Sequence, residues 1–599
     1  MSGVNDFAFK SATVNGTGSA SANSLLMQAI FRMGIPVTGK NIFPSNIQGL
    51  PTWYEVRVSA DGYTARPPQI DLMVALNPAT YAQDFAAVRP GGYLLYDSSW
   101  PLSARHRRAD ITLLGIPLGD MCREAFTGDR DRTLLRNVAY AGALTALLQI
   151  DLGVIEQTLN EKYGRKKALL ESNHRAIRLG YDYARAHFEC PLPVHCAPMD
   201  RTRDFVLMDG NTACALGALY AGATVGAWYP ITPSTSLMES FKAFCQEFRV
   251  DPKTKLNKYC ILQAEDELAA AGMVVGASWM GARAFTCTSG PGLSLMQEFI
   301  GYAYYAEIPG VFFDVQRTGP STGMPTRTQQ ADLLSMAYAS HGDTKHIVLF
   351  PADPGESFEL AVTAFDMTER FQTPVFVATD TDIGMNDWMI PRLHWDDGFT
   401  PDRGKVLDAA ALDQMQKFFR YMDEDGDGIA ARTLPGVGGK GAYFTRGSGH
   451  DQWGTYTEDA AAYQGVMDRL KRKLETAAQE LPKPVFQRQD GADVGLVTLG
   501  SPDAAVREAA DRLREQGVRA DVMRIRAFPF APEVAAFLAR YETLFVVEQN
   551  RDAQLRSLLA IETGTPRDHM IPVLDYAGLP MTAESVVHAV TRHLEGAAR

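Results

Sequence analysis

Residues 209–334 repeat one pattern, in which a short apolar strand, a turn of small or polar residues and a helix follow one another. The predicted strands are Val225–Trp228, Tyr259–Ala264, Ala284–Thr288 and Val311–Gln316, and the helices after them begin near Ser236, Glu267, Leu293 and Thr328. Such alternation predicts a parallel sheet covered on both faces, with ligands bound at the carboxyl ends of the strands. The turns therefore indicate a site around Thr232, Glu267, Ser289–Gly292 and Arg317–Arg327.

Outside this stretch the hydrophobic pattern divides the chain further. An alternating strand at Phe7–Val14 leads into a helix at Ser21–Met33, and strands at Leu72–Leu76, Tyr93–Tyr96 and Ile111–Ile116 indicate a separate α/β unit. We expect five segments: 1–188 as an N-terminal α/β domain, 189–205 as a proline-rich linker, 206–394 as the domain of repeated units, 395–486 as an irregular Gly- and Asp-rich connector, and 487–599 as a C-terminal α/β domain.

The composition is that of an ordinary globular protein, with 46% hydrophobic and 21% charged residues in a chain of 599. That length exceeds what one core supports, so we expect several domains. The net charge of −12 argues against a broad nucleic-acid-binding surface. No apolar run reaches the roughly 20 residues of a membrane span. Residues 1–10 lack the pattern of a secretory signal, so we expect a cytoplasmic protein.

The seven cysteines are scattered along the chain without a C-x-x-C pair. Iron–sulfur clusters and structural zinc sites use clustered thiolates, so we interpret these cysteines as reduced and mostly buried. If this protein transfers electrons, another chain holds the metal.

A glycine pair near the N-terminus allows two interpretations. Gly16 and Gly18 follow a predicted strand, but Ser21 takes the place of the third glycine of a dinucleotide fingerprint. The two glycines could simply permit a tight turn between strand and helix. Alternatively, they bring a helix N-terminus close to a phosphate or a pantetheine-type ligand.

An acidic turn in the connector resembles two metal-binding motifs. Asp423, Asp425, Asp427 and Gly428 match the start of an EF-hand loop, but Leu434 stands where the bidentate glutamate belongs. We therefore interpret this stretch as a solvated acidic turn. Its GDG sequence also matches the first half of a thiamine-diphosphate signature, but no Asn-Asn pair follows, so a diphosphate–magnesium site is not expected in this chain.

Glu267 follows an apolar strand and begins a helix rich in alanine and glycine. One interpretation is a first-turn carboxylate that complements the helix dipole, which Glu265 or Asp266 could equally supply. However, three adjacent acids exceed what helix capping requires, and the small residues at Ala269–Gly272 allow a flat ligand to pack closely. Both a structural and a functional role of Glu267 therefore stay open.

Arg317 ends an apolar strand, where an ion pair is the simplest interpretation. The loop after it is rich in hydroxyl groups, including Thr322 and Thr326, and a planar guanidinium surrounded by hydroxyls suits a carboxylate ligand. Thr232 stands between two prolines, which restrict its backbone. Ser289–Gly292, before a predicted helix, indicates a nest of backbone N–H groups that binds an anion.

Six segments carry a family resemblance that extends over nearly the whole chain. They are Tyr229-Pro-Ile-Thr-Pro-Ser-Thr235, Ala264-Glu-Asp-Glu-Leu268, Thr288-Ser-Gly-Pro-Gly292, Asp314-Val-Gln-Arg-Thr-Gly-Pro-Ser-Thr-Gly323, Pro529-Phe530 and Val546-Val-Glu-Gln-Asn550. These segments resemble the α subunit of a 2-oxoacid:ferredoxin oxidoreductase, most of all the 2-oxoglutarate type. The resemblance implies a multidomain α/β fold: a γ-like domain fused at the N-terminus, a pyrimidine-type thiamine-diphosphate-binding domain and a transketolase C-terminal-like domain.

The resemblance also implies a reaction. A 2-oxoacid would undergo CoA-dependent oxidative decarboxylation to an acyl-CoA and carbon dioxide, with two electrons passed to ferredoxin, or the reverse reductive carboxylation. Thiamine diphosphate would lie between this chain and a β subunit, which supplies Mg²⁺ and a [4Fe–4S] cluster, in an (αβ)₂ assembly. CoA would bind near Gly16–Ser19 and Asn41–Gly49, where the sequence departs from the family's G-x-G-G-Q-G form.

By the same resemblance, four residues would contact the cofactor. Glu267 would hydrogen-bond the aminopyrimidine ring of thiamine diphosphate and promote its activation. Pro230, Ile231 and Gly290 would line the cofactor site.

The substrate would be held by the residues of two loops. Thr232 and Arg317 would bind its carboxylate and carbonyl groups, with Thr322 and Thr326 in the same loop as the arginine. A dicarboxylate needs a second cation, and Arg327 is a candidate that could equally be a surface charge. We expect 2-oxoglutarate, with pyruvate or a branched-chain 2-oxoacid as the alternative. A two-component thiamine enzyme without electron transfer and a non-catalytic scaffold also stay open.

Overall fold

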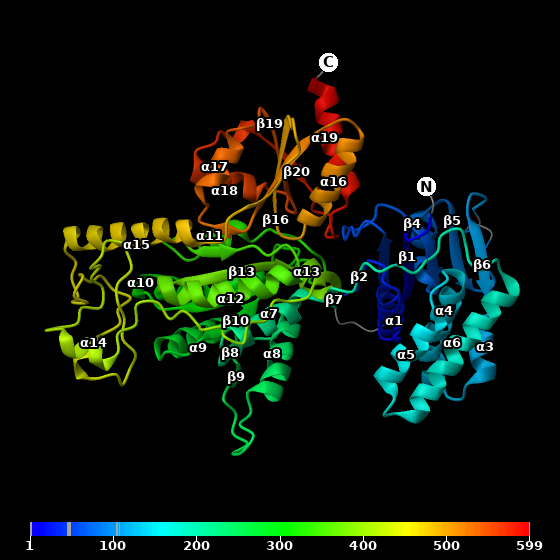
Figure 1. The fold of residues 1–599 in the computed structure, drawn as a ribbon, viewed down its shortest axis with the longest axis horizontal. Helices are drawn as coiled ribbons and strands as arrows, with labels where there is room; N and C mark the ends of the chain where they lie inside the picture. Colours follow the sequence, from blue (N-terminus) through cyan, green and yellow to red (C-terminus); the bar gives the residue numbers. More distant parts are fainter. Residues whose placement is uncertain (1–2, 45–48, 104–105, 107, 598–599) are drawn as a thin grey trace. The chain divides into compact units, whose positions relative to one another are not determined.

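The computed structural model describes residues 3–44, 49–103, 106 and 108–597. The chain forms two compact units (Figure 1). Unit 1 is formed by the chain up to Met208 with Asn386–Arg392 and Thr582–Glu584, and unit 2 by Asp209–Met385, Leu393–Met581 and the chain from Ser585. In the described part of the chain, no helix combines the length and the apolar character needed to cross a membrane.

Unit 1 is an α/β domain. Its strands are β1 (Asp6–Val14), β2 (Val37–Ile42), β3 (Pro51–Ser59), β4 (Ile70–Ala75), β5 (Val88–Asp97), β6 (Thr112–Ile116) and the separate pair β7 (Phe205–Met208) and β14 (Trp388–Pro391). Its helices are α1 (Ser19–Arg32), α2 (Tyr81–Ala87), α3 (Leu118–Ala125), α4 (Asp129–Leu147), α5 (Leu152–Tyr163) and α6 (Lys167–His187). The main sheet has the order β2-β3-β1-β4-β5-β6, in which β1, β4, β5 and β6 are parallel.

The strands predicted in the N-terminal domain are confirmed, whereas the antiparallel pair β2 and β3 was not predicted. β3 buries Glu55, whose carboxylate lies 2.8 Å from Lys10 Nζ and 2.8 Å from Arg66 Nε. Residues 54–59 of β3 nevertheless alternate apolar and polar side chains, so the sequence does contain the signal of this strand. Desolvation alone would raise the pKa of the Glu55 carboxyl group, but Lys10 and Arg66 lower it below its ordinary value. The two cations thus compensate the buried negative charge.

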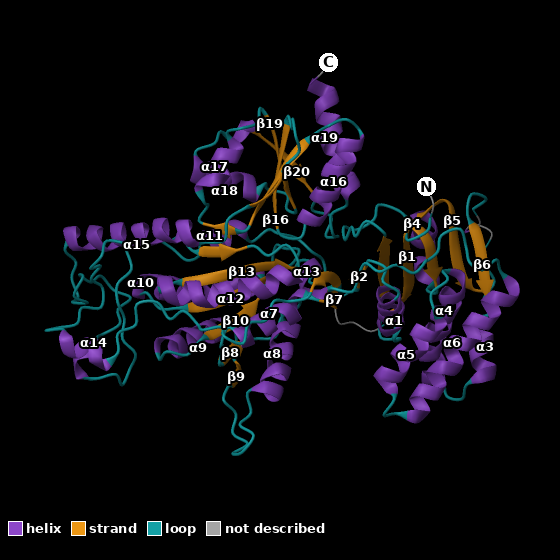
Figure 2. Ribbon diagram, viewed as in Figure 1, coloured by secondary structure: helices purple, strands orange, loops and turns teal. Residues whose placement is uncertain are grey.

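Unit 2 contains a seven-stranded sheet and a five-stranded sheet (Figure 2). The first sheet, in spatial order, is β18 (Ala527–Phe528), β12 (Ile347–Leu349), β13 (Pro374–Asp380), β11 (Gly310–Gln316), β10 (Ala284–Thr288), β8 (Val225–Trp228) and β9 (Cys260–Gln263). The second is β15 (Val485–Gln487), β17 (Ala520–Ile525), β16 (Val494–Leu499), β19 (Thr543–Glu548) and β20 (Met570–Leu574). All strands of the first sheet are parallel except β18, so the predicted parallel sheet is confirmed.

Helices cover the first sheet on both faces. They are α7 (Gly210–Tyr220), α8 (Thr235–Phe248), α9 (Glu267–Trp279), α10 (Gly290–Ala306), α11 (Leu333–Ala337), α12 (Pro354–Phe371), α13 (Thr381–Met385) and α15 (Ala460–Glu480), whereas α14 (Ala409–Gln414) lies away from the sheet in the segment 395–486 (Figure 1). The C-terminal sheet is flanked by α16 (Asp503–Glu515), α17 (Pro532–Leu538), α18 (Gln554–Thr563) and α19 (Ala583–Ala597). One core joins α7, α8, α12 and α15 to the first sheet, and another joins α10 and α11 to the C-terminal sheet.

Two predictions about local structure are wrong. The helix predicted near Thr328 is absent, since the described chain there stays irregular until the five-residue α11 at Leu333. The segment 395–486 is not irregular throughout, because α15 runs for 21 residues within it. Val466, Leu470 and Leu474 give this helix a buried apolar stripe.

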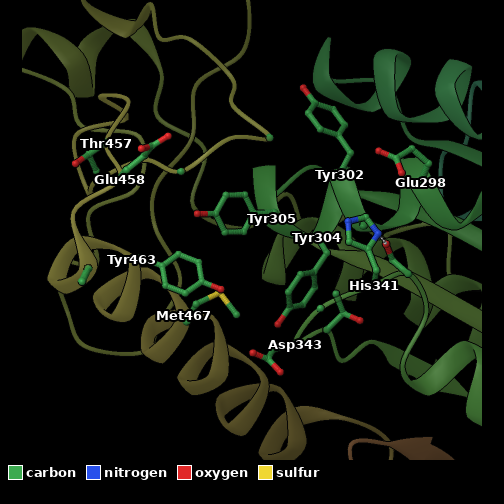
Figure 3. Close-up of a pocket in the computed structure, with 17 residues that line it drawn as sticks. Glu298, Tyr302, Tyr304, Tyr305, His341, Asp343, Thr457, Glu458, Tyr463 and Met467 are labelled. Carbon is green, nitrogen blue, oxygen red and sulfur yellow. Dashed lines mark hydrogen bonds between the residues drawn. The ribbon is translucent and has the colours of Figure 1, made fainter.

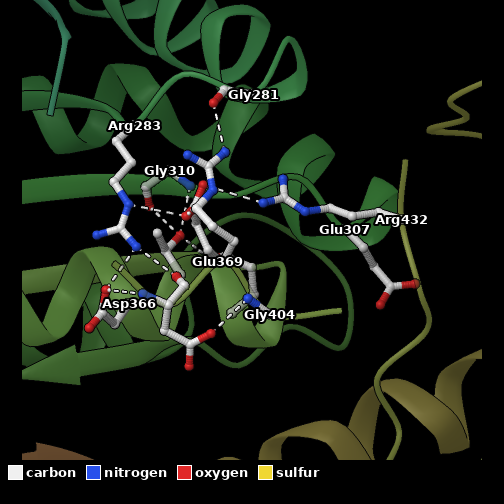
Figure 4. A network of polar contacts seen from close by, with 12 residues as sticks. Gly281, Arg283, Glu307, Gly310, Asp366, Glu369, Gly404 and Arg432 are labelled. Atoms are coloured by element: carbon white, nitrogen blue, oxygen red, sulfur yellow. Dashed lines mark hydrogen bonds and ion pairs between the residues drawn. The ribbon is translucent and has the colours of Figure 1, made fainter. Parts of the chain in front are cut away.

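Buried charges attach the segment 395–486 to the rest of unit 2 (Figure 4). The Glu369 carboxylate is bound by Arg283 at 3.1 Å, by Arg403 at 2.9 Å and by Arg432 at 3.3 Å. Arg403 and Arg432 belong to this segment. Arg283 also pairs with Asp366 at 2.8 Å, and Arg403 is partly exposed, so removal of Glu369 would leave Arg432 as the buried cation that loses its ion pair.

Candidate active site

The predicted site residues follow the strands of the first sheet of unit 2. Thr232 comes after β8, Glu267 after β9, Ser289 directly after β10 and Arg317 directly after β11. Because these four strands are parallel, their carboxyl ends lie at the same edge of the sheet.

The three adjacent acids before α9 have different environments. Asp266 is the N-cap of α9, and its side chain accepts a hydrogen bond of 2.7 Å from the Ala269 N–H. Glu265 is exposed, whereas Glu267 is buried with 6% of its surface accessible. Within the described chain the Glu267 carboxylate has no hydrogen-bond or ion-pair partner. Asp266 thus caps the helix, and Glu267 is left as a buried acceptor available to a ligand.

The first turn of α10 lies directly against Glu267. α10 begins at Gly290, three residues before the predicted start, so Ser289–Gly292 forms its N-cap and first turn. A Cβ atom on Gly292 would stand 2.0 Å from Thr288 Oγ1 and 2.7 Å from Glu267 Cγ. Only glycine fits beside the Glu267 side chain at this position. The Ser289 hydroxyl is buried and also lacks a hydrogen-bond partner in the described structure.

Arg317 joins two of the predicted loops. Its Nη1 donates a hydrogen bond of 2.6 Å to the Thr232 carbonyl oxygen, while its Nε, also buried, has no partner among the described residues. Burial lowers the pKa of Arg317, and the carboxylates of Asp332 and Glu267 act in the opposite direction. The structure therefore brings Thr232, Arg317 and Glu267 together, with hydrogen-bonding capacity left on the arginine.

Two acids near Arg317 were missed in the sequence. Burial raises the pKa of Asp332 to about 6, although the guanidinium of Arg317 opposes this rise. Asp332 approaches α10 closely, since a Cβ on Gly290 would stand 2.7 Å from its Oδ2. Asp314, in β11, is buried with both carboxylate oxygens unpartnered in the described chain, and burial and Asp332 raise its pKa. In the sequence, Asp314 stood out only as the first residue of the segment Asp314–Gly323, one of the segments that carry the family resemblance.

A cavity of about 600 Å³ opens beside Arg317. Its wall combines the first turn of α10, the loop after β11 and residues of the C-terminal sheet domain, among them Asn550, Arg551 and Tyr576. Arg317 and Arg551 are the cations of this wall, and Asp332 and Asp552 are its acids. Asn550 ends the Val-Val-Glu-Gln-Asn segment that contributed to the resemblance.

Other predicted residues lie apart from this cavity wall. Thr322 is exposed, and Thr326 is buried. Arg327 Nη1 donates to the Thr326 carbonyl at 3.1 Å and to its hydroxyl at 3.2 Å, and burial lowers the pKa of Arg327. Pro230 is exposed, and the Ile231 carbonyl accepts a hydrogen bond of 3.1 Å from the Thr235 N–H at the start of α8. The roles given to these five residues stay predictions.

In unit 1, Gly16 and Gly18 form the turn between β1 and α1. Their φ angles of 86° and 83° are in the left-handed region that favours glycine, which accounts for both residues by backbone geometry. Gly18 is the N-cap of α1 and provides no side chain to cap it. Asn41 donates its backbone N–H to the Asn386 side chain, and residues 45–48 of the predicted Asn41–Gly49 region lie outside the described residues. The CoA contacts stay a prediction.

The acidic turn of the connector is paired with cations. Lys405 Nζ lies 2.7 Å from the Asp425 carboxylate and 2.8 Å from that of Asp427, and Arg472 lies 3.0 Å from Asp423. Two cations thus face three carboxylates, with Lys405 shared between Asp425 and Asp427, and the interpretation as a solvated acidic turn stays a prediction.

The residues around Glu267 fit the aminopyrimidine ring of thiamine diphosphate. The Glu267 carboxylate, an acceptor without a partner in the described chain, lies at the N-terminus of α9. Gly292 beside it has no side chain and leaves room for the carboxylate. Such a carboxylate, shielded from water, makes a strong hydrogen bond to a ring nitrogen.

Comparisons with known proteins identify the family. Three family models match the chain: pyruvate ferredoxin/flavodoxin oxidoreductase at residues 9–183, the thiamine-diphosphate-binding model of pyruvate flavodoxin/ferredoxin oxidoreductase at 216–398, and core domain II of pyruvate:ferredoxin oxidoreductase at 492–577. The α subunit of 2-oxoacid:ferredoxin oxidoreductase 2 from Aeropyrum pernix is 32% identical over 97% of this chain and 96% of its own length. The chain belongs to the 2-oxoacid:ferredoxin oxidoreductase family.

Two further relatives of the 2-oxoacid:ferredoxin oxidoreductase family are informative. The KorA subunit of 2-oxoglutarate synthase from Methanothermobacter thermautotrophicus is 33% identical over 61% of this chain and 93% of its own length. The structure of 2-oxoglutarate:ferredoxin oxidoreductase from Magnetococcus marinus superimposes with a TM-score of 0.88 at 28% identity, covering 98% of this chain and 99% of that one. The family and the multidomain α/β fold class predicted from the sequence are confirmed.

Proposed function

We propose that this chain is the α subunit of a 2-oxoglutarate:ferredoxin oxidoreductase. The enzyme converts 2-oxoglutarate and CoA to succinyl-CoA and carbon dioxide and passes two electrons to ferredoxin, or runs the reverse reaction. The observation that carries the proposal is the convergence of Glu267, Arg317 and Thr232 at one sheet edge, with the carboxylate and the guanidinium Nε both unpartnered in the described structure. The Magnetococcus marinus relative was determined with 2-oxoglutarate, coenzyme A and succinyl-CoA bound.

Each of the three residues has a distinct role. Bound thiamine diphosphate would supply the carbon nucleophile that attacks the 2-oxo group and takes up the electrons left by decarboxylation. Glu267 holds the aminopyrimidine ring through a hydrogen bond in a site of low dielectric constant. Arg317 binds the substrate carboxylate through its free N–H groups, and its bond to the Thr232 carbonyl fixes the orientation of the guanidinium. A fixed cation needs no reorganisation during the reaction.

An exposed apolar surface beside Glu267 supports a β subunit as partner. α9 and its C-cap carry no charged side chain from Leu268 to Ala282. Leu262 of β9 and Leu268, Met273 and Met280 along this helix are all exposed, Met280 to 59%. Apolar side chains grouped in this way are typical of protein interfaces. A β subunit seated on β9 and α9 would cover the helix that Glu267 begins, and two such pairs would form the proposed (αβ)₂ assembly, with ferredoxin reduced at a cluster in the partner.

The choice of 2-oxoglutarate requires a cation for the second carboxylate. Arg327 is one candidate from the sequence, but its guanidinium contacts Thr326, and it does not line the cavity beside Arg317. Arg551 does line that cavity and is 72% exposed in its side chain. The second cation is therefore tested with both Arg327→Ala and Arg551→Ala, each compared on 2-oxoglutarate and pyruvate.

The test is to produce this chain with its β subunit and to measure CoA-dependent reduction of methyl viologen. We expect 2-oxoglutarate to give a much higher kcat/KM than pyruvate or branched-chain 2-oxoacids, with succinyl-CoA as product. Preference for another 2-oxoacid would contradict the substrate assignment. Release of carbon dioxide without viologen reduction would indicate a non-redox thiamine enzyme.

A further inference from the structure

A second cavity, of about 730 Å³, lies in unit 2 between α10 and α15 (Figure 3). We call it the tyrosine cavity, because its wall includes Tyr302, Tyr304 and Tyr305 of α10 and Tyr463 of α15. The loop at residues 340–344 and the segment before α15 complete the wall. None of these residues belongs to the candidate active site, so the cavity has no part in the proposed reaction.

The charge of the tyrosine cavity is negative. Its wall carries Glu298, Asp343 and Glu458, and no lysine or arginine stands among the described residues that line it. In the described chain Glu298 and Asp343 have neither an ion-pair nor a hydrogen-bond partner. Glu458 accepts a hydrogen bond from the Tyr456 hydroxyl. Three exposed carboxylates in one concave wall, with His341 as the only basic side chain among the described lining residues, attract a positively charged ligand.

Two tyrosine residues of this wall have hydroxyl groups in different surroundings, and that of Tyr304 has no described partner. Tyr304 is 4% exposed, and its hydroxyl, which points toward Asp343 in Figure 3, makes no hydrogen bond to any described residue. The Tyr305 hydroxyl is buried without a partner at good hydrogen-bond geometry, and burial raises its pKa, whereas the His450 backbone beside it acts to lower that pKa. Burial, together with Glu307 and Asp343, raises the pKa of Tyr304, so its hydroxyl stays neutral. Buried polar groups normally have partners, and unsatisfied ones that face a cavity point to a ligand.

The adjoining cavity is also lined by more acids than bases, but unlike the tyrosine cavity it carries two lysines. It measures about 930 Å³ and shares Tyr304, Asp343 and Met467 with the tyrosine cavity. There Lys345 pairs with Glu562 at 2.7 Å, and Lys471 and Glu475 lie 3.9 Å apart. The acids of the tyrosine cavity therefore have no lysine or arginine beside them among the described residues of its wall, and the adjoining space, where Asp468 adds a further acid, gives room for an extended ligand.

We propose that the tyrosine cavity binds an organic cation, with an ammonium or guanidinium group held by Asp343 against the tyrosine rings and with Glu298 at the other end of the wall available to a second cationic group (Figure 3). Aromatic faces attract such cations, and carboxylates add ion pairs and acceptors for their N–H groups. Neutral tyrosine hydroxyls accept further hydrogen bonds. The cation could be a free diamine or the basic side chain of a partner protein, and the chemistry is the same for both.

Calorimetric titration of the full chain with putrescine and agmatine tests the proposal. We expect saturable binding with a Kd near 1 mM, about what two partly exposed ion pairs and a cation–π contact provide. The neutral 1,4-butanediol serves as the matched probe and should not bind. Repetition with the chain bound to its β subunit separates the sources: retained binding indicates a free cation, and binding lost only in the complex indicates a partner's basic side chain.

Variants of the cavity wall test whether the binding measured by calorimetry takes place in the tyrosine cavity. Glu298→Gln and Asp343→Asn should each weaken binding about threefold and together about tenfold. Glu515→Gln, an exposed residue of α16, is the matched control and should have no effect. Tyr463→Leu, at a half-exposed position, should weaken binding without unfolding the chain. Absence of saturable binding, or affinities unchanged by the cavity variants, overturns the proposal. No turnover is measured, so this result is independent of the proposed reaction.

Discussion

Replacing Gly292 by alanine should displace Glu267 without changing its chemistry. The added Cβ would lie 2.7 Å from Glu267 Cγ and 2.0 Å from Thr288 Oγ1, whereas ordinary van der Waals contact begins at 3.4 Å. Glu267 must therefore move by about 0.7 Å and the Thr288 hydroxyl by about 1.4 Å, unless the backbone shifts. Misplacement of a catalytic group by about 1 Å costs on the order of 100-fold in rate.

Stability should change much less than activity. Overpacking by one methyl group costs roughly 1–3 kcal/mol, and the better helix propensity of alanine offsets up to about 1 kcal/mol of this. We therefore expect Gly292→Ala to fold and to assemble with its β subunit while its kcat for viologen reduction falls about 100-fold.

Gly465→Ala is the matched control for this variant. Gly465 lies in α15, away from the candidate active site and from the proposed β-subunit surface, and nothing stands within 4 Å of a Cβ added there, so this variant should keep the activity of the wild type. Initial rates at saturating 2-oxoacid and CoA, with thermal unfolding midpoints for all three proteins, decide the question. Wild-type activity in Gly292→Ala, or an equal loss in Gly465→Ala, would refute the reasoning.

Three further variants test other parts of the structure. Arg317→Lys keeps the charge but loses the planar fork, so the KM for the 2-oxoacid should rise about tenfold or more, as initial rates would show. Arg327→Ala should raise the KM for 2-oxoglutarate more than that for pyruvate; equal changes would exclude it as the second cation. Burial raises the pKa of the Glu307 carboxyl group, but Arg469 and Lys473, the latter at 2.9 Å, lower it to below its ordinary value. The ionised Glu307 therefore stabilises the folded chain at pH values above the ordinary carboxyl pKa, and this stabilisation is lost as the pH falls. Glu307→Gln should therefore lower the unfolding temperature clearly at pH 7 and progressively less toward acid pH, and a pH-independent difference would contradict this.

Local pattern predicted the central fold because its strands are short and apolar and its turns are rich in glycine, proline and hydroxyls. β8 and β10 were predicted to the residue. α15 was missed for a physical reason: Arg469 and Lys473 occupy buried positions on its apolar side and interrupt the periodicity. Both side chains can be buried because they pair with Glu307. Glu307 is far from α15 in the sequence, so no local pattern reveals these ion pairs.

The candidate site was predictable as a set of turns and not as a set of contacts. The sequence indicated Glu267 among three acids, but only the structure shows that Asp266 caps α9 and that Glu265 is exposed. Asp332 and Arg551 lie on the cavity wall beside Arg317 because the loop after β11 and the end of β19 meet there. Such a meeting is set by tertiary packing.

The assignment of Glu267 as the acceptor for the thiamine ring is the central claim, and one comparison tests it most directly. Glu267→Gln and Glu265→Gln remove the same charge from neighbouring positions, one buried and one exposed. Methyl viologen reduction with 2-oxoglutarate and CoA should be measured for both variants, each assembled with the β subunit. The account predicts a loss of at least about 100-fold in Glu267→Gln and wild-type activity in Glu265→Gln. Equal activities of the two variants, or a loss confined to Glu265→Gln, would contradict it.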